Sequence, residues 1–193
     1  SSSSRVSTGG LRRFAVEARQ LQEIGVWPHR LEIVADGCGP WCDGELGALR
    51  GIALSKLDIS GVRGIAAADV ASLAAGIRSL QHQGLMGRDF ALVARGCDWG
   101  AEGERLRAWC GVAFGMLDLS RFANLSSASI EAFFRSLAAL QRAGQMTAAA
   151  VLIARYCDWA PQSSMLCERD GDGDGRNGLL LGLARAGVAF AKI

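Results

Sequence analysis

The sequence contains two copies of one pattern, placed 60 residues apart without a gap. Segments 50–99 and 110–159 are identical at 16 of 50 aligned positions. The matches include Cys97-Asp98-Trp99 in the first copy and Cys157-Asp158-Trp159 in the second. Such a tandem unit constrains the fold strongly, because stacked units bury a core that no unit could bury alone.

The pattern continues beyond both copies. Segment 21–38 matches 80–97 at an offset of 59, and Gly187–Phe190 repeats Gly111–Phe114. Because the register starts and stops within a unit and no initiator Met is present, we expect a fragment or processed form of a longer array. We predict a single helical-repeat array over residues 1–193, made of a flexible segment 1–8, a partial unit 9–45, units 46–103 and 104–160, a junction insertion 160–178 and a partial unit 179–193.

Apolar residues in each unit recur at helical spacing. They predict a long helix over 67–83 and its equivalent over 127–143, with apolar positions at i, i+3, i+4, i+7 and i+10. Each predicted long helix, including one in the first unit, stops at a glycine: Gly25, Gly84 or Gly144. Glycine adopts positive φ readily and so closes the last turn of a helix.

Two shorter helices are predicted to complete each unit. One follows the long helix, over 29–37, 88–96 and 147–156, and the other precedes it, over 47–57, 104–117 and 179–192. The prediction is therefore an all-α fold, an α-solenoid of ~60-residue three-helix repeats with no strands. Its Leu- and Ala-rich texture resembles helical-repeat proteins, including arrays of mitochondria and chloroplasts that bind RNA or ribosomal parts. The resemblance implies a binding role and transfers no functional position, because the unit differs from the ~34-residue and ~40 to 47-residue repeats.

Three cysteines, Cys38, Cys97 and Cys157, occupy one repeat position. We interpret them as packing residues, since reduced Cys behaves as a small buried hydrophobe. Metal ligation is disfavoured because equivalent residues lie one unit apart, too far to share an ion. Cys38 and Cys42 are separated by three residues, whereas a thioredoxin-type redox motif needs two. The remaining cysteines have no repeat partners, which indicates free thiols in a reducing, intracellular compartment.

Candidate partner-binding residues recur with the repeat. Trp99 and Trp159 occupy equivalent turns, where they could stack on bases or anchor a partner, or instead seal the junction between units. Arg95 and Arg155 also match, although Asp36 stands at this position in the first unit.

One motif suggests a metal. Asp170, Asp172 and Asp174, followed by Gly175, have the spacing that opens an EF-hand calcium loop. The closing position holds Leu181 where a bidentate Glu is needed. The segment also falls within the junction insertion, so a solvated acidic loop explains it without an ion. We therefore assign no metal and keep these residues as a weak calcium candidate.

The sequence lacks the patterns of an enzyme. His29 and His82 occupy different repeat positions, and no nucleophile–base pattern or phosphate-binding Gly loop accompanies them. We expect no catalysis and no cofactor. No apolar run reaches the ~20 residues that span a bilayer; the longest, 179–190, contains Arg185.

Two binding functions remain. We expect a non-catalytic scaffold subunit that docks on protein subunits of a larger assembly, because apolar content is 50% and net charge only +2. The alternative is an RNA-binding array of an organellar ribosome or RNA-processing complex. It is favoured by the matched Arg95 and Arg155 and by Arg at 19 of 21 basic positions. The acid-free start 1–13 fits either a linker or the remnant of a transit peptide, so mitochondrion and plastid are the candidate compartments.

Overall fold

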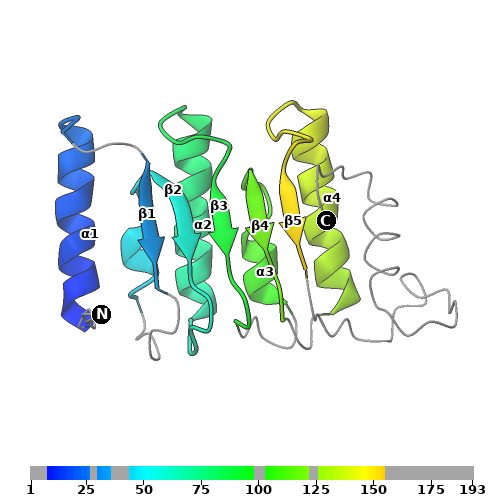
Figure 1. The fold of residues 1–193 in the computed structure, drawn as a ribbon, viewed down its shortest axis with the longest axis horizontal. Coiled ribbons are helices and arrows are strands. Elements are labelled where there is room, and N and C mark those ends of the chain that lie inside the picture. The colour runs from blue at the N-terminus through cyan, green and yellow to red at the C-terminus, as the bar shows by residue number, and fades with distance from the viewer. Residues whose placement is uncertain (1–7, 27–29, 36–43, 98–102, 122–125, 155–193) are drawn as a thin grey trace, which may run out of the picture.

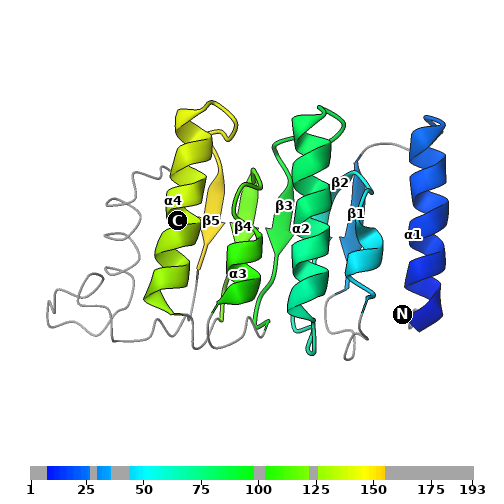
Figure 2. The ribbon, with the colours of Figure 1, turned by 180° about the vertical axis from the view of Figure 1, so that it is seen from behind.

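Five parallel strands form one sheet, and helices lie on one of its faces (Figures 1 and 2). The computed structural model describes residues 8–26, 30–35, 44–97, 103–121 and 126–154. Strand order in the sheet follows the sequence, so the chain advances by one strand at a time. The elements are α1 (Thr8–Glu23), β1 (Leu31–Val34), the 3₁₀ helix η1 (Gly47–Leu49), β2 (Leu54–Asp58), α2 (Ala67–His82), β3 (Ala91–Val93), α3 (Glu104–Ala108), β4 (Met116–Asp118), α4 (Ser127–Arg142) and β5 (Val151–Ile153).

The prediction of an all-α solenoid without strands is wrong. The segments predicted as the helix after the long one contain β1, β3 and β5. Of the segments predicted as the preceding helix, 47–57 begins with the short η1 and 104–117 with the short α3, and β2 and β4 follow. The third, 179–192, lies outside the described residues. Strands of a parallel sheet are often continuous apolar runs, and runs of three to five residues have too little length to show a period of two. The 60-residue repeat is therefore two helix–strand units, one with a short helix and one with a long helix.

The long helices occur close to their predicted positions. α2 and α4 begin at the expected residues, and the Ser126 side chain caps α4 by accepting a bond from the Ser129 N–H at 3.3 Å. Glycines with φ of +72°, +72° and +65° follow α1, α2 and α4. After α2, the N–H of Leu85 bonds to the carbonyl of Leu80 at 2.9 Å, which is the Schellman arrangement that a positive-φ residue permits.

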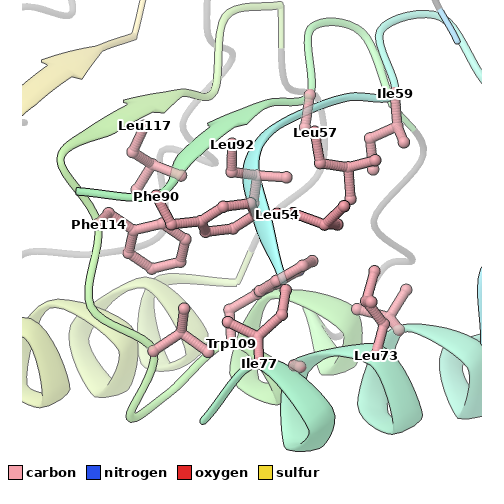
Figure 3. Close-up of a cluster of buried hydrophobic side chains, with 14 of the residues drawn as sticks. Leu54, Leu57, Ile59, Leu73, Ile77, Phe90, Leu92, Trp109, Phe114 and Leu117 are labelled. Atoms are coloured by element: carbon pink, nitrogen blue, oxygen red, sulfur yellow. The ribbon is translucent and has the colours of Figure 1, made fainter. Parts of the chain in front are cut away.

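The strands pair in register, so equivalent residues form rows across the sheet. Side chains alternate between the two faces along a strand. One row faces the helices and consists of Ile33, Leu57, Leu92, Leu117 and Leu152. This row belongs to a continuous hydrophobic core between sheet and helices (Figure 3). Phe90, Trp109 and Phe114 are fully buried there, with ring centroids 5.9–6.4 Å apart.

Glutamines connect α1 and α2 to the residues that precede β2 and β4. The Gln81 side chain, near the end of α2, donates to the carbonyl of Ala113 at 2.8 Å and accepts from the Ala113 N–H at 3.0 Å. Gln22 makes the same pair of bonds to Ala53, at 2.9 and 2.8 Å. Both glutamines are buried, so each satisfies backbone groups that solvent reaches poorly. We name this arrangement the glutamine clamp.

Candidate protein-binding face

The sheet has one face that none of the described helices covers (Figures 1 and 2). We name it the open face. It consists of the two strand rows that flank the core-facing leucine row. One row is Glu32, Lys56, Ala91, Met116 and Val151, and the other is Val34, Asp58, Val93, Asp118 and Ile153. Ser60, Arg95 and Ser120 continue the alternation beyond the ends of β2, β3 and β4.

The open face is apolar over β3, β4 and β5. Ala91, Met116, Val151 and Ile153 are each partly exposed there. Val93, between them, is buried yet does not belong to the core cluster under the helices. A contiguous apolar group on an otherwise uncovered surface is typical of an interaction site.

Arg95 and Asp118 form an ion pair on this face. Arg95 Nε donates to Asp118 Oδ2 at 2.6 Å, with the Arg95 side chain 57% exposed and the Asp118 side chain 1% exposed. Asp118 Oδ1 accepts from the Ser120 N–H at 3.0 Å. Both carboxylate oxygens are therefore bonded, which allows this charge to be buried next to apolar residues.

Asp58 occupies the equivalent position one repeat earlier. Its Oδ1 accepts from the N–H of Ser60 at 3.0 Å and from the Ser60 hydroxyl at 2.6 Å. None of the described residues donates to its Oδ2, and it forms no ion pair with Lys56 in this part of the chain. The side chain is partly exposed. On the β1–β2 part of the open face, Asp58 therefore has one carboxylate oxygen, Oδ2, that none of the described residues binds.

Of the predicted partner-binding residues, only Arg95 lies within the described residues, and it is on the open face. Arg155, Trp99 and Trp159 lie outside the described segments, as do the calcium candidates Asp170, Asp172 and Asp174. Among the cysteines of the repeat position, Cys38 and Cys157 also lie outside. Cys97 is buried, and its thiol donates to the carbonyl of Ile59 at 2.9 Å, which links one unit to the one before it.

The described arginines do not share one face. Arg95 is on the strand side, whereas Arg78 belongs to α2 and donates to the carbonyls of Ala108 and Cys110 at 2.7 and 2.8 Å. These carbonyls lie at the C-terminal end of α3, where a cation is favourable. Arg135 lies on α4 and pairs with Glu131. The described surface therefore contains no continuous arginine ladder of the kind that follows a nucleic-acid backbone.

No group of His, Cys, Asp or Glu within them is arranged to hold a metal ion. A shallow recess near the end of α2 is lined by Gln81, His82, Arg88, Gly111, Ala113, Leu140 and Gln145, a set without a carboxylate or thiol. Burial raises the pKa of the Cys110 thiol, although a hydrogen bond with Ser136 and the positive charge of Arg78 oppose this shift. A raised pKa makes a thiol less reactive at neutral pH.

Fold and face together define a parallel α/β solenoid, in which each unit supplies one strand and one helix or 3₁₀ turn. Comparisons of the chain with protein-family profiles, curated proteins and solved structures find no match. Within the described residues, no helix combines the length and apolar character needed to cross a membrane.

The glutamine clamp and the open face were both missed in the sequence. Gln22, Gln81 and Gln141 recur at offsets of 59 and 60, next to an apolar residue each time. That recurrence of a polar residue at the apolar edge of a helix was the available signal for the clamp. The open face had no comparable signal, because its rows exist only once the strands are paired.

Proposed function

We propose that this protein is a non-catalytic repeat scaffold that binds a protein partner through the open face. The observation that carries the proposal is the apolar group of Ala91, Met116, Val151 and Ile153, flanked by the charged residues of β1 and β2. An apolar centre with a polar rim is the usual composition of a protein interface. Solenoids commonly bind partners along such an extended surface.

Two further observations support binding of a protein over binding of RNA. The charges of the open face have both signs, with Lys56 and Arg95 among Glu32, Asp58 and Asp118, so they supply no strongly positive field. In the helix layer, Arg78 bonds to backbone carbonyls and Arg135 pairs with a glutamate. No described feature favours the RNA alternative.

Selection of displayed peptides from a random library tests the proposal. The bait is the whole chain, and each selected peptide is then measured against Met116→Asp and Arg135→Asp. We expect Met116→Asp to weaken binding by about 10-fold or more, because it places a charge within the apolar centre. Arg135→Asp is the matched control, since it introduces the same carboxylate on the helix side. Peptides that bind Met116→Asp as well as they bind the wild type would contradict the proposal, and so would a library that yields no binder.

A further inference from the structure

We infer that the partner of the open face presents a basic side chain, Arg or Lys, to Oδ2 of Asp58. This inference rests on the proposed function and names the chemistry of the partner. It comes from comparing two equivalent positions of the same molecule, Asp58 and Asp118.

The two aspartates share one local structure. Each follows the leucine of the core-facing row, and each accepts the N–H of the serine two residues later at 3.0 Å through Oδ1. They differ at Oδ2. Oδ2 of Asp118 accepts from Arg95 Nε at 2.6 Å, whereas none of the described residues donates to Oδ2 of Asp58. At the equivalent position, the group that bonds to Oδ2 is thus the guanidinium of an arginine.

Neither described strand beside β2 supplies that group to Asp58. Arg95 follows β3, which lies between β2 and β4, but its Nε bonds to Asp118. β1 places Val34 in register with Asp58, and Val34 is 61% exposed. The equivalent of Val34 one repeat later, Val93, is only 3% exposed. Among the described residues, the β1–β2 end of the open face thus lacks both the cation and the apolar cover that the corresponding positions have further along the sheet.

Binding of a partner makes the missing cation energetically important. A partner that covers Val34 and Met116 also removes water from Asp58, which lies between them in the sheet. A carboxylate that loses water without gaining a cation or a hydrogen bond opposes binding strongly. A basic side chain of the partner satisfies it, in the way that Arg95 satisfies Asp118.

The sheet also sets the spacing that the partner needs. β2 and β4 are separated by one strand, which places them about 10 Å apart. Met116 is in the row of Lys56, two residues along the strand from the row of Asp58, so Asp58 and Met116 lie about 12 Å apart. The partner is therefore a protein segment whose basic residue lies roughly 12 Å from an apolar side chain. Two observations favour this partner over a purely apolar one: the equivalent Asp118 is paired with an arginine, and Asp58 carries the opposite charge to a basic side chain.

The displayed-peptide selection tests this chemistry with one more variant. Asp58→Asn keeps the Oδ1 acceptor for Ser60 and removes the charge, so the fold is retained. We expect peptides selected on the wild-type chain to be enriched in Arg or Lys and to bind Asp58→Asn about 10-fold more weakly. Asp69→Asn is the control, because Asp69 accepts from the Gly44 N–H on the helix side. Binding should also weaken as salt rises.

The outcomes separate this inference from the proposed function. Peptides that lose binding to Met116→Asp but bind Asp58→Asn normally overturn the basic contact and leave the open face as the docking surface. Peptides without Arg or Lys lead to the same conclusion. Peptides that bind Met116→Asp normally overturn the docking surface itself.

Discussion

Removal of one glutamine clamp should destabilise the repeat strongly, and Gln81→Ala is the variant that tests it. The substitution leaves the N–H and the carbonyl of Ala113 without their partners. It also removes a weaker bond at 3.2 Å to the carbonyl of Gly87. Each buried backbone group that loses its partner costs about 1–3 kcal/mol. Water can reach the vacated position from the adjacent recess, so we expect the lower part of the summed range, about 2–4 kcal/mol.

Urea denaturation followed by far-UV circular dichroism measures this loss. Gln83→Ala is the matched control, since Gln83 lies two residues away and its bond to Ser79 is exposed. We expect the control to change the free energy of unfolding by less than about 0.5 kcal/mol. Amide hydrogen exchange gives a second readout: in Gln81→Ala the Ala113 amide should exchange faster, whereas the Ala53 amide, held by Gln22, should change less. Equal stability of the two variants would refute the clamp as a source of stability.

Gln81→Glu gives the clamp a pH dependence. Only the protonated carboxyl can donate to the Ala113 carbonyl while accepting from its N–H, so the folded state raises the pKa of the introduced group. Stability relative to the wild type should therefore be retained below the pKa of the unfolded state and lost as pH rises through the folded-state pKa. If the difference in the free energy of unfolding between Gln81→Glu and the wild type stays constant from acidic to neutral pH, this reasoning is wrong.

Three other predictions concern an ion pair, two glycines and a thiol. Asp118→Asn should lower the free energy of unfolding by about 1 kcal/mol, because the Arg95 side chain is 57% exposed and solvent screens the pair. In the same denaturation assay, this difference should shrink as the salt concentration rises. Gly115→Ala should cost more than Gly144→Ala in melting experiments, since a Cβ at position 115 would lie 2.7–2.9 Å from the Asp89 backbone, whereas position 144 has open space and only its positive φ to oppose alanine. The raised pKa of Cys110 should make stability fall as pH rises above the ordinary thiol range, and Cys110→Ser should flatten that alkaline decline; an unchanged decline would assign it to other groups.

The sequence predicted the long helices correctly because their apolar residues sample a full helical period. Val70, Leu73 and Ile77 of α2 recur over enough turns to exclude a strand. The strands were misjudged because they are only three to five residues long, and β3 and β5 are continuously apolar. Leu92-Val93 fits a helix equally well in isolation, and only the pairing with β2 and β4 distinguishes its two faces.

The candidate site was harder to predict than the fold, for a related reason. Arg95 was identified from its recurrence, but its partner Asp118 lies on another strand. Oδ1 of Asp118 binds the N–H of Ser120, two residues later in the same segment. The bond from Arg95 to Oδ2 of Asp118 depends on the register that brings β3 beside β4. An apolar residue such as Met116 does not stand out in the sequence. Its place on the open face follows only from the alternation of side chains between the two faces of a strand.

The strand order also has a consequence for how the chain folds. Each described strand pairs only with strands next to it in the sequence, and the glutamine clamp joins elements within one repeat of each other. No described pairing therefore requires the two ends of the chain to meet, and the entropy lost on closing each loop stays small. Folding can begin at any helix–strand pair and spread in both directions. A damaged clamp should interrupt that spread at its own position and leave the units on either side able to form.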